Sequence, residues 1–356
     1  MKDPGHERLL ADFAAGRKAA LARAISIVEN HRPGFERLLA ELHPLIGRAR
    51  RVGLTGPPGA GKSTLVTSLT RHYRRVGHTV GIVAVDPTSP FTGGALLGDR
   101  IRMEDVALDP GVYIRSLATR GSLGGLSSAT RETCDVLDAF GIDRILIETV
   151  GVGQSELDVA RTADTSLVVL VPESGDSIQT LKAGLMEIAD VFTVNKSDRP
   201  GADRLRNELE IMLGMRSGGT MRNVPAHHGV DLTRNNLVKQ VRLAARDDDA
   251  ESWIPPVLST AAAKEQGIDE LVEALDRHFR YLERSGTLRM RRRARLRERV
   301  VEVVEDKTRR RLWGDAATNA WLEERLPSLE SGAETPFGIA DALLSRSADL
   351  LARTTT

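Results

Sequence analysis

The sequence is almost without cysteine and without an excess of charge. Cys134 is the single cysteine among 356 residues, which excludes an internal disulfide framework and a thiolate-rich metal cluster. Lys and Arg together number 50, and Asp and Glu number 49, for a formal net charge of +1. Proteins whose main task is to coat nucleic acid usually have a basic excess, so this balance argues against that class.

Long apolar runs are also absent. No stretch of about 18 apolar residues occurs, so we expect no membrane-spanning helix and no membrane partner. The amino-terminal stretch MKDPGHERLLADFAAGRK mixes acids with bases. It therefore resembles neither a secretory signal nor an acid-poor transit peptide, and we expect a cytoplasmic protein.

What the chain does have is enough apolar material for a sizeable core. Hydrophobic residues make up 41% of it, and its length suits one large α/β domain with appendages. Residues 1–48 place Leu9, Leu10 and Phe13 on one helical face. They predict an N-terminal helical extension.

Short apolar runs separated by helical lengths follow from residue 51. Runs that are apolar on both faces are typical of parallel strands covered by helices. Their alternation with helical segments predicts an α/β fold with a doubly wound, mainly parallel sheet. The predicted strands are RVGLT (51–55), TVGIVAV (79–85), VYIRS (112–116), RILIET (144–149), SLVVLV (166–171), VFTVN (191–195) and PVLS (256–259).

Two segments depart from this rhythm. Residues 216–252, with Gly218-Gly219 and an acidic run, predict an insertion within a domain that spans residues 49–285. Residues 286–356 predict a helical tail that is strongly basic at first. A solvated helix or a dimerising arm is the simpler interpretation of this tail, because acids are interleaved from Glu298 onward and aromatic partners for bases are missing. We therefore expect no nucleic-acid partner.

A phosphate-binding loop follows the first predicted strand directly. The pattern G-x-x-x-x-G-K-[ST] stands between a strand and an apolar-periodic helix, which is the setting that confirms a P-loop NTPase. Glycines let backbone N–H groups turn onto phosphate oxygens, and the helix N-terminus adds partial positive charge. Lys62 should reach the β- and γ-phosphates, and the Ser63 hydroxyl should bind Mg²⁺. The loop comprises Gly56, Pro57, Pro58, Gly59, Ala60, Gly61, Lys62, Ser63 and Thr64.

Four residues that begin at the end of the predicted strand VFTVN indicate which base is bound. Asn195-Lys196-Ser197-Asp198 has the N-K-x-D arrangement of guanine readers at a strand end, where open α/β sheets bind ligands. Asp198 can accept hydrogen bonds from guanine N1–H and the 2-amino group, whereas adenine would leave it unpaired. Asn195 should brace the loop, and the stem of Lys196 should lie along the base. A backbone clamp on O6 is expected from Thr260, Ala261 and Ala262.

Three acids are candidates for the metal. Asp86 ends a predicted strand, Asp99 follows in GDRIRM, and Glu148 begins E-T-V-G, with Glu where D-x-x-G is usual. Mg²⁺ takes oxygen ligands, so one or two of these carboxylates should hold it with Ser63. Gln154 or one of the acids could orient the attacking water, and the residues do not decide between them. The interval from Lys62 to Glu148 is much longer than in Ras-like GTPases.

Taken in order, six segments closely resemble the MeaB/ArgK family. They are GPPGAGKST, VAVDPTSP, GALLGDRIRM, ETVGVGQSE, SIQTLKAGLMEIAD and VNKSD, and the resemblance covers roughly residues 20–286. Members of that family are GTPase chaperones of adenosylcobalamin-dependent acyl-CoA mutases, related to the human methylmalonic aciduria type A protein. The chain departs from the family in the length of residues 216–252 and in Ala261-Ala262, where Ser-Ala is common.

The resemblance implies a mechanism and partners. It implies that Asp86, Asp99 and Glu148 are Mg²⁺ and switch acids, and that residues 175–187 form a further switch that includes Lys182. It also implies a GTPase that cycles between GTP and GDP, is stimulated by its mutase and gates delivery of cobalamin. Members are homodimers joined by the C-terminal arm. Two alternatives remain open at this point, a chaperone GTPase for nickel enzymes and a transport-linked kinase.

Overall fold

The structure, a computed structural model, describes residues 3–87, 103–119, 125–149, 159, 161–173, 185–216 and 252–347. The chain divides into two compact units, Met1–Leu288 and Arg289–Thr356. Of the segment predicted as an insertion, residues 217–251 lie outside the described part. None of the described helices is both long enough and apolar enough to cross a bilayer.

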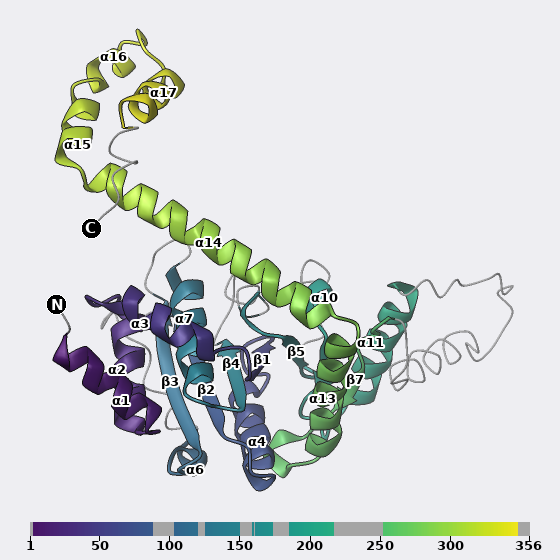
Figure 1. The fold of residues 1–356 in the computed structure, drawn as a ribbon. Coiled ribbons are helices and arrows are strands. Elements are labelled where there is room, and N and C mark those ends of the chain that lie inside the picture. Colours follow the sequence, from purple (N-terminus) through teal and green to yellow (C-terminus); the bar gives the residue numbers. More distant parts are fainter. Residues whose placement is uncertain are drawn as a thin grey trace, which may run out of the picture. The chain divides into compact units, whose positions relative to one another are not determined.

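Seven parallel strands form one sheet in the first unit (Figure 1). Their order is β3-β2-β4-β1-β5-β6-β7, and each strand runs parallel to its neighbours. The strands are β1 (Arg50–Thr55), β2 (Val80–Pro87), β3 (Val112–Thr119), β4 (Arg144–Thr149), β5 (Thr165–Leu170), β6 (Val191–Val194) and β7 (Val257–Ser259). All seven predicted strands and the doubly wound α/β fold are confirmed. The chain winds to one side of β1 and then to the other, so the ligand crevice is expected at the carboxyl end of β1.

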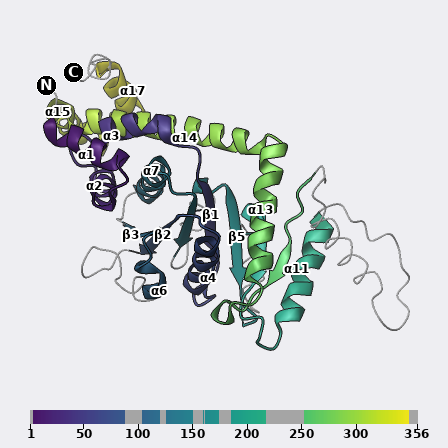
Figure 2. The same cartoon turned by 60° about the horizontal axis from the view of Figure 1, so that its bottom comes forward.

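Helices cover both faces of this sheet. In the first unit they are α1 (Pro4–Ala14), α2 (Lys18–Glu29), α3 (Phe35–Leu42), η1 (His43–Leu45), α4 (Lys62–Arg75), α6 (Glu104–Ala107), α7 (Gly125–Ala139), α10 (Leu185–Ile188), α11 (Ala202–Arg216), η2 (Ala262–Lys264) and α13 (Ile268–Arg284). Figures 1 and 2 show α1–α3 beside α7 at the β3 end of the sheet and α11 beside β7 at the other end.

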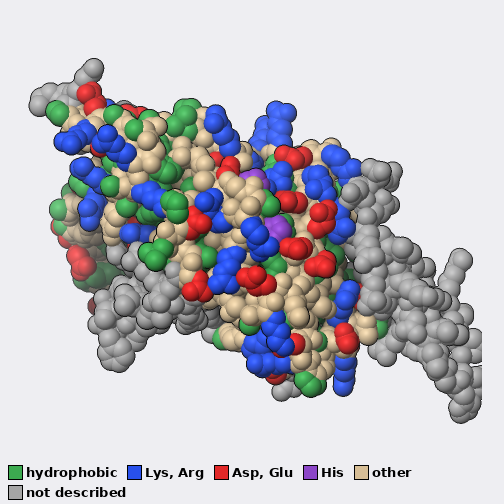
Figure 3. Space-filling view, turned by 90° about the horizontal axis from the view of Figure 1, so that it is seen from below, with side chains coloured by type: hydrophobic (Ala, Val, Ile, Leu, Met, Phe, Trp, Pro, Cys, Tyr) green, Lys and Arg blue, Asp and Glu red, His purple; other side chains and the backbone are tan. Residues whose placement is uncertain are grey.

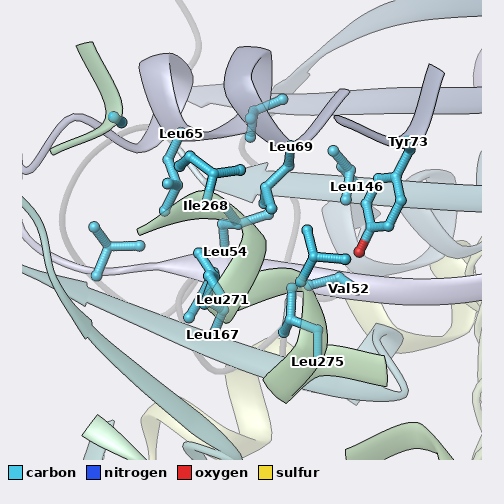
Figure 4. Close-up of a cluster of buried hydrophobic side chains, with 14 of the residues drawn as sticks. Val52, Leu54, Leu65, Leu69, Tyr73, Leu146, Leu167, Ile268, Leu271 and Leu275 are labelled. Atoms are coloured by element: carbon cyan, nitrogen blue, oxygen red, sulfur yellow. The ribbon is translucent and has the colours of Figure 1, made fainter. Parts of the chain in front are cut away.

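The alternation of side chains along the strands builds the core on one face. Leu54 of β1 and Leu167 of β5 point toward α4 and α13, where they meet Leu65, Leu69 and Leu271 (Figure 4). All five are fully buried. Because α4 follows the phosphate loop directly, this packing fixes the position of the loop relative to the sheet.

The N-terminal helices cover part of the opposite face. Leu21, Ile25 and Val28 of α2 are buried against a cluster that includes Leu137 of α7 and Ile145 of β4. The helical extension predicted for residues 1–48 therefore shares a core with the sheet.

A buried carboxylate ties this extension to β1. Asp138 of α7 accepts hydrogen bonds from three successive backbone amides, those of Gly47, Arg48 and Ala49, at 2.8, 3.0 and 2.9 Å. Its Oδ2 atom also lies 3.1 Å from a guanidinium nitrogen of Arg51. The connection between η1 and β1 is thus held by charge-assisted hydrogen bonds.

The second unit is helical. It comprises most of α14 (Thr287–Gly314), followed by α15 (Ala316–Glu323), α16 (Leu326–Glu330) and α17 (Pro336–Arg346). Its buried apolar residues include Leu312, Ile339 and Leu343. A helical tail was predicted here, and it is confirmed.

Candidate functional site

Glycines shape the loop between β1 and α4. Gly56 has φ +139°, and a Cβ atom there would lie 2.1 Å from the carbonyl oxygen of Val169. Gly61, at the N-cap of α4 with φ +84°, would place a Cβ atom 2.5 Å from Nδ2 of Asn195. Side chains at these two positions would force the loop away from β5 and from Asn195. Gly59, with φ +75°, has open space where its Cβ atom would be.

Lys62 lies across this loop. Its side chain is buried, and its ammonium donates hydrogen bonds to the carbonyl oxygens of Gly56 at 2.7 Å and Pro57 at 3.0 Å. The positive charge is therefore held over the same turn of backbone that a phosphate chain would occupy in a P-loop.

An oxygen pair stands beside the start of α4. The Ser63 hydroxyl donates a 2.6 Å hydrogen bond to Oε1 of Glu148. Glu148 is near the carboxyl end of β4, next to Leu54 of β1, and is almost fully buried. A hydroxyl and a carboxylate in contact form a hard oxygen donor set of the kind that binds Mg²⁺.

The backbone brings a second predicted acid to the same edge. Ala84 of β2 pairs with Glu148 of β4, so Asp86 is two residues further along the adjacent strand. The side chain of Asp86 lies outside the described part of the structure, as do Asp99, Gln154 and Lys182. Their predicted roles are therefore not tested by the structure.

Asn195 connects three loops. It is buried, and its Nδ2 donates to the carbonyl oxygen of Ala60 in the phosphate loop at 2.8 Å. Its Oδ1 accepts hydrogen bonds from Thr260 Oγ1 at 3.2 Å and from the Ala262 amide at 3.1 Å. The phosphate loop, the N-K-x-D segment and the loop after β7 are thereby fixed relative to one another.

Asp198 lies at the outer end of this arrangement. Its Oδ2 is 2.8 Å from the ammonium of Lys264, a residue that sequence reasoning did not single out. The Lys264 hydrogen bond lowers the pKa of the Asp198 carboxyl below its ordinary value, so the carboxyl is ionised at neutral pH. Lys196 adopts φ +55°, which a side-chain-bearing residue rarely does and which marks a tight turn before Asp198.

The predicted site residues that are described gather at one edge of the sheet. The phosphate loop follows β1, Glu148 lies at the end of β4, Asn195 to Asp198 follow β6, and Thr260 to Ala262 follow β7. Hydrogen bonds join the phosphate loop to Glu148 and to Asn195, and they join Asn195 to the loop after β7. The segment that carries Asp198 is held by the Ser197 amide, which donates to the Thr260 carbonyl at 2.9 Å. The arrangement combines a phosphate cradle, an oxygen donor pair and an ionised carboxylate.

Residues 21–317 match the family model described as methylmalonyl Co-A mutase-associated GTPase MeaB. The chain belongs to the MeaB family. It is therefore a GTPase that binds guanine nucleotide and hydrolyses GTP.

Individual relatives are similar to this chain over nearly its whole length. A Pyrococcus horikoshii protein, named as a candidate GTPase, is 42% identical over 96% of this chain and 98% of its own. The mitochondrial methylmalonic aciduria type A homolog of Mus musculus is 32% identical over 95% of this chain and 78% of its own. The crystal structure of a protein named LAO/AO transport system kinase superposes with a TM-score of 0.66 and 25% identity, covering 99% of both chains.

Proposed function

We propose that this MeaB-family GTPase is a chaperone of an adenosylcobalamin-dependent acyl-CoA mutase. In this proposal, GTP hydrolysis gates cobalamin delivery and protects the mutase from inactivation. The family's description as mutase-associated supports a mutase partner, and so does the similarity to the methylmalonic aciduria type A homolog. Binding of GTP is supported above all by the hydrogen bonds of Asn195, which join the phosphate loop to the loop after β7.

At the phosphate end, Lys62 would move from the carbonyl oxygens of Gly56 and Pro57 to the β- and γ-phosphates. The backbone N–H groups at the start of α4 would bind phosphate oxygens, with the helix dipole in support. At the base end, Asp198 would accept hydrogen bonds from guanine, and the backbone of Thr260, Ala261 and Ala262 would contact O6.

The Ser63 hydroxyl and the Glu148 carboxylate fit Mg²⁺ by the chemistry of their donors, since both are oxygen ligands already in contact. Asp86 and Asp99 are proposed as further carboxylate ligands of the ion. Bound there, the ion would neutralise charge that develops on the transferred phosphoryl group. Gln154 is a candidate for orienting the attacking water, and Lys182 for coupling hydrolysis to the partner.

The partner half of the proposal is tested by measuring GTP turnover with and without each candidate mutase. The candidates are the methylmalonyl-, isobutyryl-, 2-hydroxyisobutyryl- and ethylmalonyl-CoA mutases. One of them should co-purify with the chain and raise turnover, by up to about 10³–10⁵-fold if it completes the catalytic groups as activating proteins do. Lys62→Ala is the control, because it should abolish hydrolysis in every mixture. The mutase proposal fails if none of the four binds or stimulates.

A kinase role is the alternative that one comparison favours, through the name of the LAO/AO transport system kinase structure. The two functions differ in where the γ-phosphate goes. With GTP labelled at that phosphate, a GTPase chaperone should release all the label as inorganic phosphate. Stoichiometric label on a protein would favour the kinase.

The C-terminal arm is proposed to join two copies of the chain. Leu312 is the single buried residue among the 28 residues of α14. Met290, Leu296, Val300 and Val304 are each more than half exposed. An apolar face of this length on a single helix is best explained by contact with a partner of the same kind.

A further inference from the structure

The contact between Lys264 and Asp198 has no role in the function proposed so far. Lys264 is the last residue of η2, and its ammonium is 2.8 Å from Oδ2 of Asp198. Asp198 is the group that would distinguish guanine from other bases. A cation placed on that carboxylate must therefore affect base recognition.

The loop that carries Lys264 is closed on itself. Its amide donates to the Ala261 carbonyl at 2.8 Å, and Ala261 forms an antiparallel bridge with Gln266. Gly267 then turns with φ +72°, and a Cβ atom there would lie 2.2 Å from the carbonyl oxygen of Ser259. The backbone of Lys264 is thus set by a short, internally bonded turn that requires glycine at its end.

The same loop is attached to the rest of the site at both ends. Ser68 of α4 donates to the Ala262 carbonyl at 3.0 Å, and Arg71 of α4 lies 2.9 Å from Glu265. The Ser197 amide donates to the Thr260 carbonyl at 2.9 Å. Lys264 therefore extends toward Asp198 from a platform fixed both to the helix behind the phosphate loop and to the base-reading segment.

Packing does not enclose the Asp198 carboxylate, so its orientation depends on a neighbouring charged group such as Lys264. The Asp198 side chain is 34% exposed, so packing alone does not select one orientation. The adjacent cation, Arg199, is engaged in an ion pair with Glu173. A carboxylate has about four acceptor positions, so a lysine at one position of Oδ2 leaves others for the base.

We propose that Lys264 is a specificity-positioning residue, which holds the Asp198 carboxylate in the orientation that receives both N1–H and the 2-amino group of guanine. This inference rests on the proposed role of Asp198 in the GTPase site. Exposed ion pairs contribute modestly, so loss of Lys264 should weaken guanine binding by about two- to fivefold.

The experiment compares GDP with inosine diphosphate, which shares O6 and N1–H with GDP but lacks the 2-amino group. Affinities of both are measured by calorimetry for the wild-type chain, Lys264→Met and Lys264→Arg. Arg75→Met is the matched control, because Arg75 lies 4.0 Å from Glu265 of the same loop and is itself largely exposed. A general shift of the loop would change both affinities equally, since the loop's O6 contact is common to both ligands.

We expect Lys264→Met to weaken GDP binding about two- to fivefold and inosine diphosphate binding by a smaller factor, because inosine diphosphate shares N1–H but lacks the 2-amino group. The preference for GDP should therefore fall. Lys264→Arg should restore most of the preference, and Arg75→Met should leave it unchanged. An unchanged preference in Lys264→Met, or equal losses for both ligands, would overturn the positioning role while leaving the GTPase site intact. A wild-type chain that bound GDP no better than ADP would instead overturn the base reader, and this inference with it.

Discussion

At the scale of single residues, the contact between Ser63 and Glu148 predicts that Glu148 is needed for Mg²⁺ binding. Glu148→Gln keeps the shape of the side chain but removes its charge. It should therefore raise the Mg²⁺ concentration needed for half-maximal GTP hydrolysis by at least about tenfold. Titrating Mg²⁺ in a steady-state assay measures this directly.

Glu132→Gln is the matched control for this variant. Glu132 is also almost fully buried, but it pairs with His31, at 3.2 Å, and not with a residue of the phosphate loop. Its substitution should leave the Mg²⁺ requirement unchanged. If Glu148→Gln retained the wild-type requirement, Glu148 would not be a ligand of the ion.

Asp198 supports a second prediction at this scale. Asp198→Asn places an amide opposite guanine, where its N–H₂ group faces donors instead of accepting from them. The preference for GTP over other nucleotides should fall by about 10²-fold or more, because the polar groups of the base are left unpaired. Nucleotide competition assays give the ratio.

Xanthosine nucleotides provide the positive arm of that experiment, since xanthine has a carbonyl in place of the 2-amino group. Their binding should improve in Asp198→Asn while GTP binding declines. Asp203→Asn, an exposed change in the first turn of α11, serves as the control. Wild-type GTP selectivity in Asp198→Asn would rule out its role as base reader.

At the scale of elements, the junction between the N-terminal helices and β1 depends on Asp138. Its carboxylate is 1% exposed and receives three backbone hydrogen bonds as well as the charge of Arg51. Asp138→Ala should lower the free energy of unfolding by about 3–5 kcal/mol, since it leaves three amides without their acceptor and removes one of the two carboxylates that pair with Arg51. Denaturant titration tests this.

Asp135 offers the comparison within the same helix. It also pairs with Arg51, at 2.8 Å, but its side chain is 35% exposed. Asp135→Ala should therefore cost less, about 1 kcal/mol or below, because solvent screens the pair. Equal losses in the two variants would mean that the buried amide contacts add nothing to the junction.

The strands were predictable from the sequence because their residues are apolar on both faces, as Leu167 and Val168 illustrate by joining cores on opposite sides of the sheet. The phosphate loop and the base reader were predictable because their chemistry is local in sequence. Lys264 was not, since its contact with Asp198 depends on how the turn around Gly267 closes. The hydrogen bonds from three amides to Asp138 could not be predicted either, because they join helix α7 to a segment far earlier in the chain.

At the scale of the whole molecule, acidic and basic residues nearly cancel, for a net charge of +1. On the face that Figure 3 shows, basic and acidic side chains are interleaved. Single-sign attraction is therefore a poor basis for partner choice. The exposed apolar side chains of α14 are the stronger candidates for assembly.

The assembly prediction concerns Val300 and Val304, which are 63% and 56% exposed one helical turn apart. Replacing both with Glu should convert a dimer into monomers, because four like charges would be brought together in the shared interface. Light scattering coupled to size-exclusion chromatography measures the mass. Val76→Glu, a change at a similarly exposed valine of the first unit, should leave the dimer intact.

Comparing these variants shows whether the dimer interface lies on α14 or on another surface. A wild-type chain that is monomeric at all concentrations would contradict the dimer. A dimer that survived both glutamates would place its interface outside this part of α14.

The hydrogen bonds of Asn195 have a consequence for how the two ends of a nucleotide cooperate. Asn195 and Ala60 are 135 positions apart in sequence, yet their contact sets the spacing between the phosphate cradle and the base reader. The guanosine and phosphate parts of GTP can then be regarded as two ligands on a rigid linker that matches the span between their sites. Once one end is seated, the other meets its site at a high effective concentration, and the affinity of the whole exceeds what either end achieves alone.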